Sequence, residues 1–428
     1  MLATVHVLHP QPTVIGGYLR VGHTGHRRLE ALHAAGTLKF NRLVFDAAHI
    51  DEQIVLLRAL KASGYEVILD PNFAEMAAVG QFESSVRKLP WANANTPWKA
   101  SDFGRESNLS PARLIAEFAI KHGVDAVLSP SHLIETVDDA WWAVDRSLTE
   151  HLRLELDRNG GSDIAIDHQV ITTSALLRDH KGRAQIISAI ENLPIQNLWL
   201  KVSGFGATAT GAGTRAYIES VRDLHAMGRP LIADATGGFA GLAAAAFGAV
   251  TGISHGVCQK ESFDANRWKR PASKGGGIGT RIYIPDLDRY LTEEQLNIVF
   301  AVKGGKSRVG CMDTSCCPRR EDQIEHSDAH MLTRRSRQLE DLSHVPELRR
   351  AEHLLLRHID PAVRPARQCA QLKLADEKVA RVVVEAKKRL TRLRDALGDL
   401  QATESMPTWS GPLTFRGGSS SINAVIGR

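Results

Sequence analysis

Ionisable side chains recur where short apolar runs end in the first two thirds of the chain. Asp70, Asp167 and Asp234 each stand at or near such an end, and Lys201 lies near another. Two carboxylates can divide nucleophilic and acid–base work at a sugar carbon, whereas a lysine whose pKa is lowered by burial can form a Schiff base with a carbonyl group. The sequence therefore predicts carboxylate chemistry or lysine chemistry, if the fold brings these ends together.

Further candidates for substrate binding adjoin the same ends. His168 follows Asp167 directly, and His255 closes another apolar run. Gly237 and Gly238 follow Asp234 and precede an alanine-rich stretch, so free N–H groups at a helix N-terminus could receive an anion or a carbonyl oxygen. Tight packing of small residues is the alternative explanation for these glycines.

A cluster of cysteines follows residue 310. Three of the five cysteines, Cys311, Cys316 and Cys317, fall within seven residues, and an odd, crowded set is not a disulfide framework. Thiolates followed by histidines favour a structural Zn²⁺ site with sulfur and nitrogen ligands, although free thiols or a redox pair are alternatives. Further ligands could come from Asp313, His326, His330, His344 or His353.

The elements that would position these residues alternate regularly. Short β-branched runs without clean polar alternation are each followed by a stretch of helical character, as in Asp51–Ser63, Ser110–His122 and Gly213–Met227. Such runs are typical of a parallel sheet covered by helices, and eight of them predict a (β/α)8 TIM barrel, with an open doubly wound sheet as the rival. The eight runs are Arg42–Asp46, Glu66–Asp70, Asp125–Ser129, Ile164–His168, Asn197–Ser203, Pro230–Asp234, Thr251–His255 and Arg281–Pro285.

Two loops between these runs could cover a substrate. The loop Pro90–Trp98 is long and aromatic, so Trp91 and Trp98 could stack on a base, although aromatic residues more often pack a loop down. The glycine-rich segment Lys274–Arg281 could hold a phosphate or could simply connect two elements.

Charge is concentrated in the last third of the chain. Residues 301–428 contain 23 Lys and Arg against 16 Asp and Glu, whereas the preceding residues are nearly balanced. Apolar residues recur at helical spacing along Leu372–Asp399 with cations on the other faces, which predicts a basic amphipathic helix. An anionic partner such as nucleic acid, or a merely solvated face, would explain it. The Gly- and Ser-rich end is expected to be frayed.

Composition sets the outer limits. The 428 residues are 43% hydrophobic and 24% charged, with a mean hydropathy of −0.18, which excludes a disordered chain or a disulfide-stapled miniprotein. No run approaches the ~18 apolar residues of a membrane span, and the start lacks a signal-peptide pattern, so we expect a cytoplasmic protein without a membrane partner. We expect a barrel over 1–305, a Cys/His zinc element over 306–345 and a basic helical extension over 346–428.

A barrel followed by a cysteine cluster and a basic tail resembles the tRNA-guanine transglycosylase superfamily, which includes relatives that insert 7-deazaguanines into DNA. The family's C-x-C-x-x-C motif is preserved at Cys311 and Cys316, with Asp313 in place of its middle cysteine and Cys317 as a substitute. His344, or His330 in the preceding helix, is similar in position to the family's histidine. The family's nucleophile position after the seventh strand holds Ser254 and His255 instead of aspartate, with Asp264 ten residues later.

The resemblance implies exchange of a guanine for a 7-deazaguanine-type base in tRNA or DNA. It implies Asp70 as acid/base, Asp234 as nucleophile with Asp264 as its competitor, and Asp167 as the residue that binds the base edge. A homodimer is a further expectation. Two other hypotheses remain open: an aldolase- or lyase-type barrel enzyme that uses Lys201, and a nucleic-acid-binding protein without catalysis.

Overall fold

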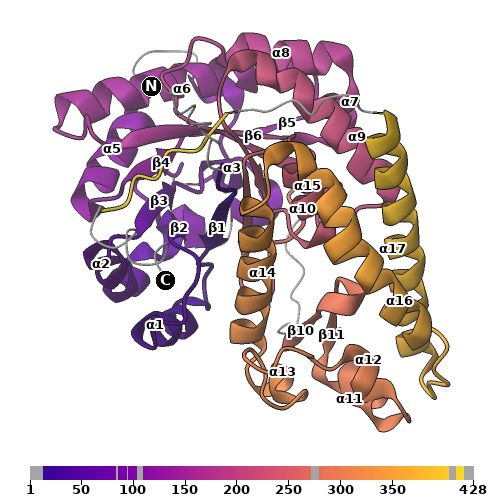
Figure 1. Cartoon of the computed structure of the whole chain (residues 1–428). Helices are drawn as coiled ribbons and strands as arrows, with labels where there is room; N and C mark the ends of the chain where they lie inside the picture. Colours follow the sequence, from indigo (N-terminus) through magenta and orange to yellow (C-terminus); the bar gives the residue numbers. More distant parts are fainter. Residues whose placement is uncertain are drawn as a thin grey trace, which may run out of the picture.

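The computed structural model describes residues 13–82, 85–93, 95–103, 109–270, 279–403 and 411–418. Eight parallel strands close into a ring surrounded by helices, which confirms the predicted (β/α)8 barrel (Figure 1). Neighbours pair in the order β4-β3-β2-β1-β9-β8-β7-β6, and β4 pairs with β6 to complete the ring. The strands are β1 (Gly16–Arg20), β2 (Arg42–Asp46), β3 (Glu66–Asp70), β4 (Ala126–Leu128), β6 (Ala165–Thr173), β7 (Leu198–Ser203), β8 (Leu231–Asp234) and β9 (Gly252–Gly256).

The predicted number of strands is right, but one member is wrong. Arg281–Pro285 was expected as the eighth strand, yet β10 (Arg281–Ile284) pairs antiparallel with β11 (Arg289–Thr292) in a separate hairpin. The missing barrel strand is β1, at the start of the described chain. The short β5 (Leu133–Ile134) also pairs with β6, beyond the end of β4.

β1 escaped prediction because its apolar pattern is interrupted by two glycines, which the fold requires. A Cβ on Gly16 would lie 2.4 Å from Leu413 Cδ1, and one on Gly17 would lie 2.9 Å from Phe40 Cε1. Close packing on both faces of the strand therefore excludes side chains there, although a run with two glycines has low strand propensity.

Helices cover the outside of the barrel. Ser110–His122 is a helix with the predicted bounds, whereas Asp51–Ser63 and Gly213–Met227 each divide into a 3-10 turn and an α-helix. Their buried faces contact the outer faces of the strands and form the main core. The helices of this layer are α1 (His26–Ala34), α2 (Ile54–Ala62), α5 (Ser110–His122), α6 (Trp141–Arg158), α7 (Ser174–Arg178), α8 (His180–Ile190), α9 (Gly211–Arg222) and α10 (Gly238–Ala246).

The last third of the chain packs along one side of the barrel, where Figure 1 shows its orange and yellow helices. α14 contacts β1 and the hairpin strand β10, α15 contacts α10, and α17 packs on α9. The predicted basic helix is therefore present as α17. The helices here are α11 (Glu293–Ala301), α12 (Gly305–Val309), α13 (Asp322–Glu325), α14 (Ser327–Ser343), α15 (Glu347–Leu354), α16 (Asp360–Cys369) and α17 (Glu377–Thr403).

Residues 411–418 were expected to be frayed, and this is wrong. Leu413 packs against the side chain of Tyr18 inside the barrel, and Phe415 lies 5.1 Å from the guanidinium of Arg42. The segment lies at the end of the barrel where the strands begin. Within the described ranges, no helix combines the length and apolarity that a membrane span requires.

Candidate functional site

The barrel interior holds an apolar layer in its middle and a charged layer above it. The apolar layer contains Tyr18, Val44, Ile68, Trp199 and Ile232. Because side chains alternate along a strand, the residue two positions later in each strand points into the same interior one layer higher. Those residues are Arg20, Asp46, Asp70, Lys201 and Asp234. They lie at the carboxyl ends of the strands, where the catalytic groups of (β/α)8 enzymes are found.

Arg20 is the centre of the charged layer. Its Nε and Nη2 each donate to one oxygen of Asp234 at 2.7 Å, and its Nη1 donates to Asp70 Oδ2 at 2.7 Å. Asp234 also accepts from Gln169 Nε2 and from the N–H of Ala235, both at 2.8 Å. Burial alone would raise the pKa of Asp234, but Arg20 outweighs burial and lowers that pKa to about 2. Asp234 is thus a permanently charged anchor whose two oxygens are both occupied.

The other two carboxylates are held as well. Asp70 Oδ1 accepts from the N–H of Asn72 at 2.9 Å. Asp46 Oδ2 accepts from Lys260 Nζ at 2.8 Å, and Asp46 Oδ1 lies 3.6 Å from Arg20. Burial opposes ionisation of Asp46, but Lys260 and Arg20 together lower its pKa.

Lys201 differs from its charged neighbours. Its side chain is 9% exposed, and its ammonium makes no hydrogen bond or ion pair with any described residue. It lies instead over two aromatic rings, 5.4 Å from the centroid of Phe263 and 5.1 Å from that of Trp268. The layer therefore contains one amine that has aromatic walls and no fixed carboxylate partner.

Glu75 supplies a carboxyl group beside this amine. It lies in α3 (Phe73–Met76), directly after the loop that follows β3. Burial raises the pKa of Glu75, Lys201 opposes that rise, and Asp70 and Asp46 add to it. A carboxyl whose pKa is raised is a better proton acceptor than an ordinary carboxylate and can act as an acid or a base.

These groups face one cavity of about 710 Å³. Four of the charged residues described above line this cavity: Arg20, Asp46, Glu75 and Lys201. Other residues that line it are His23, His49, Glu52, Asn72, Gln81, Ser85, Lys88, Lys260, Ser262, Phe263 and Trp268. The volume suits a small molecule, and the lysines among its walls favour an anionic one.

The structure brings Asp70 and Asp234 together, as expected, but places Asp167 elsewhere. Asp167 lies at the lower end of the barrel, where it accepts hydrogen bonds from Arg416, Asn197 Nδ2 and Trp199 Nε1. It is fully buried by these partners. The prediction that Asp167 binds a substrate at the same opening is wrong, because Asp167 enters the interior near the start of β6 rather than at its end.

Asp264 is not a second nucleophile in this cavity. Its exposed carboxylate accepts from the N–H of Asn266 at 3.0 Å and caps a short 3-10 turn. A carboxylate in this position stabilises the turn and faces solvent. The prediction for Asp264 is therefore wrong.

His168 and His255 lie on the outer faces of their strands, away from the cavity. His168 Nδ1 lies 2.8 Å from Ser129 Oγ and 3.3 Å from Thr149 Oγ1 of α6, and burial lowers the pKa of His168 to about 4. His255 packs edge-on against Phe40 and bonds the carbonyl of Gly256. Both predicted binding roles are wrong, because the alternation of β6 and β9 directs these rings into the barrel wall.

A carboxylate of the same chain, that of Asp288, occupies the glycine-rich N-terminus of α10. The N–H of Phe239 donates to Asp288 Oδ2 at 2.9 Å. A Cβ on Gly237 would lie 2.4 Å from Glu261 Cδ, and Gly238 has a φ of +65° that favours glycine. The prediction that Gly237 and Gly238 bind a ligand is wrong, because the carboxylate of Asp288 already occupies this terminus. Arg389 of α17, which the sequence placed on a free cationic face, is drawn inward to pair with Asp288 at 2.9 Å.

The aromatic loop is packed down. Trp91 is buried and its Nε1 donates to the carbonyl of Pro71 at 3.0 Å, while Trp98 Nε1 donates to the carbonyl of Trp91 at 3.2 Å. Neither ring lines the cavity, so the alternative explanation for this loop is confirmed. Most of the segment Lys274–Arg281 lies outside the described residues.

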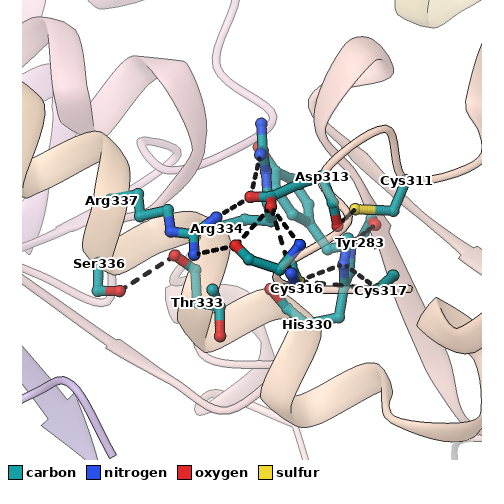
Figure 2. A network of polar contacts seen from close by, with 11 residues as sticks. Tyr283, Cys311, Asp313, Cys316, Cys317, His330, Thr333, Arg334, Ser336 and Arg337 are labelled. Atoms are coloured by element: carbon teal, nitrogen blue, oxygen red, sulfur yellow. Dashed lines mark hydrogen bonds and ion pairs between the residues drawn. The ribbon is translucent and has the colours of Figure 1, made fainter. Parts of the chain in front are cut away.

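Cys311, Cys316, Cys317 and His330 converge between the hairpin and α14 (Figure 2). Their ligand atoms all lie within 4.8 Å of one another. His330 Nδ1 is 3.4 Å from the sulfurs of both Cys316 and Cys317, and its Nε2 bonds the carbonyl of Tyr283 at 2.9 Å. A bond from the second ring nitrogen to a backbone carbonyl fixes the ring orientation of a metal-ligating histidine. The cluster can therefore hold a metal ion with three sulfurs and one nitrogen.

Electrostatics within the cluster favour a cation. Hydrogen bonds from Cys316 and Cys317 lower the pKa of Cys311, and the Cys311 sulfur in turn raises the pKa of Cys316 to about 11. Several thiolates so close together cannot all ionise without added positive charge. A divalent ion supplies that charge and releases the protons on binding.

The other proposed ligands do not join this cluster. His344 is exposed at the end of α14, where its Nδ1 bonds the carbonyl of Glu340. Asp313 forms ion pairs with Arg334 and Arg337, as Figure 2 shows. His330 is therefore the histidine of the cluster, and the prediction of His344 is wrong, because His344 lies 14 residues, about 21 Å, farther along the helix axis.

Sequence reasoning missed three residues of the charged layer and its surroundings: Arg20, Glu75 and Lys260. Arg20 was missed with β1 itself. Lys260 lies in a loop and Glu75 lies in the one-turn helix α3, and no periodicity marks either residue. The alternation of Tyr18 and Arg20 in Gly16–Arg20 is the one signal that could have found the first of them.

Comparisons with known proteins report no matching family and no matching curated protein. The chain is similar to solved structures at very low identity. A type I 3-dehydroquinate dehydratase from Clostridium difficile is 9% identical with a TM-score of 0.34, covering 60% of this chain and 89% of that one. An HpcH/HpaI aldolase from Desulfitobacterium hafniense is 11% identical with a TM-score of 0.32, covering 57% and 86%. A two-module fragment of xylanase 10B from Clostridium thermocellum is 12% identical with a TM-score of 0.37, covering 61% and 64%. Likeness at this level identifies no activity.

Proposed function

We propose that this protein is an enzyme that forms a Schiff base between Lys201 and a small anionic carbonyl compound. The observation that carries the proposal is the state of Lys201, an amine in the cavity that bonds no carboxylate among the described residues, while Asp46, Asp70 and Asp234 are bonded by other cations. An amine that already forms an ion pair must lose that partner before it can react. Lys201 forms no ion pair with a described residue, so it does not have to lose a partner before it reacts.

The residues around Lys201 suit the steps of such a reaction. The Lys201 ammonium first gives a proton to a base such as Glu75, and the neutral amine then attacks the carbonyl carbon. The carbonyl oxygen receives one proton from the attacking nitrogen and one from Glu75, and it leaves as water. The iminium that results withdraws electrons from the adjacent carbon, so that a C–H or C–C bond there can break. Glu75, with its raised pKa, can supply and remove the protons at this position.

Borohydride trapping tests the proposal. Hydride reduces the iminium carbon to a secondary amine, so incubation with pyruvate, as a minimal anionic carbonyl probe, should add a stable mass to a peptide that contains Lys201. Lys201→Met should remove the adduct. Lys260→Arg is the matched control. It removes a different amine of the cavity, the one that bonds Asp46, and it keeps the positive charge. An adduct that persists in Lys201→Met and disappears in Lys260→Arg would refute the assignment.

We also infer that the ion of the Cys311, Cys316, Cys317 and His330 cluster is a structural Zn²⁺. Three thiolates and one imidazole form a closed ligand set of the kind that zinc prefers, which leaves no position for a substrate. The ion would join the segment after the hairpin to α14. Metal analysis of the purified protein should find zinc, and Cys316→Ser should reduce both the zinc content and the melting temperature.

Base exchange in nucleic acid is the second candidate function. The observation in its favour is the convergence of the cysteines with His330, which is similar to the metal site that the transglycosylase resemblance implies. Exposed cations on α17, among them Arg381, Lys388 and Arg392, could contact phosphates. The two carboxylates that it needs, Asp70 and Asp234, are both bonded to Arg20. Incorporation of labelled guanine into tRNA or DNA, absent in Asp70→Asn, would establish this activity in place of the first.

A further inference from the structure

A second group of possible metal ligands lies on the C-terminal helices, apart from the cysteine cluster and the barrel cavity. Asp341 of α14 meets two histidines of the following helical segment. His353 Nε2 lies 2.7 Å and His358 Nε2 lies 2.8 Å from the same oxygen, Asp341 Oδ2. The three ligand atoms lie within 4.8 Å of one another.

The local backbone accounts for this convergence. Residues five apart on an α-helix point about 140° away from each other, so His353 and His358 would not share a face. Residues Leu355–Ile359 instead form a π-helical turn between α15 and α16. A π turn contains one residue more than an α turn and is frequent at functional sites. The extra residue brings His358 round to the face of His353, where both rings meet Asp341.

Proline helps to place the π turn here. Pro361 has no N–H, so it cannot donate to the carbonyl of Arg357 as an α-helix requires. The ladder is already interrupted at that point, which lowers the cost of a wider turn. The proline that favours the π turn therefore lies close in sequence to the two histidines that the turn brings together.

We propose that Asp341, His353 and His358 bind a divalent transition-metal ion such as Zn²⁺ or Ni²⁺. Two imidazoles and one carboxylate are ligands that these ions accept, and water can fill the remaining positions. The side chain of Asp341 is 48% exposed and those of His353 and His358 are 24% and 14% exposed, so an ion can enter from solvent. The ion would link α14 to the helical segment that follows it.

Metal titration of the full chain tests this proposal. The protein is stripped with a chelator under reducing conditions, and its binding of Zn²⁺ is measured by calorimetry. The variant His353→Ala/His358→Ala should bind one equivalent fewer than the native chain. His344→Ala is the matched control, because it removes an exposed histidine at the end of the same helix without touching the three ligands. It should bind as many equivalents as the native chain.

The readout separates this site from the cysteine cluster. If the cysteine cluster binds no zinc, the native chain and the double variant both lose one equivalent, and the difference between them persists. A spectroscopic check uses Co²⁺, which gives a thiolate charge-transfer band only at the cysteines; the double variant should keep that band while its total Co²⁺ falls. Equal binding by the native chain and the folded double variant would overturn the proposal.

Discussion

The two ends of the barrel contain the same arrangement, an arginine that bonds two carboxylates. At the upper end Arg20 bonds Asp70 and Asp234, and at the lower end Arg416 bonds Glu66 and Asp167. In both cases one guanidinium joins carboxylates from two different strands inside the barrel. Planar guanidinium groups suit this task because they donate to two carboxylates at once.

The ends differ in what surrounds the arginine. Below, Leu413 of the same segment packs against the apolar layer, and the Phe415 ring lies against the guanidinium of Arg42. Above, Arg20 lines an open cavity, and Lys201 remains there without a carboxylate partner. Buried charge alone therefore does not mark a site of chemistry. The cavity and the amine, which bonds no carboxylate of the described residues, distinguish the end for which we propose chemistry from the other end.

Arg20→Met should have the largest effect. It leaves Asp70 and Asp234 buried without their counter-charge, which we expect to lower the free energy of unfolding by about 3–5 kcal/mol and to abolish trapping at Lys201. Urea denaturation and the borohydride assay measure the two effects. A stable variant that still forms the adduct would show that Arg20 organises neither the barrel end nor the site.

Arg416→Met should have a smaller effect on stability and none on chemistry. Arg416 is 9% exposed and comes from a terminal segment that can separate from the barrel, so water can reach Asp167 and Glu66 in the variant. We expect a loss of about 2–3 kcal/mol in unfolding free energy, with the adduct at Lys201 retained. Loss of the adduct in a folded Arg416→Met protein would contradict the division between the two ends.

The histidine in the barrel wall and the carboxylates inside the barrel should affect stability in different ranges of pH. Burial lowers the pKa of His168 to about 4, so between roughly pH 6.5 and pH 4 the unfolded chain binds a proton that the native protein does not. Stability should therefore fall as pH falls, by about 2 kcal/mol from pH 7 to pH 5. Asp234, with a pKa of about 2, stabilises the native protein above roughly pH 4, and this stability is lost only as the pH falls from roughly 4 to 2.

Denaturation curves at pH 7 and pH 5 measure this loss. His168→Gln should remove the part of the loss that His168 causes, because the amide does not titrate, whereas the buried His255, whose pKa burial also lowers, keeps its own part. An unchanged slope in this variant would mean that another group causes the acid sensitivity.

The sequence predicted the layers of the fold better than the membership of the site. Seven of the eight predicted strand–helix repeats and the amphipathic pattern of α17 are present, and both depend on local periodicity. The proximity of Asp70 and Asp234, which both bond Arg20, followed from the rule that parallel strands end at one edge. Asp167 failed the same rule because the run Ile164–His168 extends to residue 173, which leaves Asp167 at the lower end of β6.

The chain by itself determined that a helix-covered parallel barrel would form, since burial of short β-branched runs on both faces admits few other solutions. It also determined that Cys311, Cys316 and Cys317 would lie close to one another, because they are neighbours in sequence. Only the tertiary structure decided which side chains point into the barrel and at what height. It selected His330 over His344, placed Arg416 beside Asp167 and left Lys201 unpaired, because these contacts join residues that are distant in sequence and depend on strand register and helix rotation.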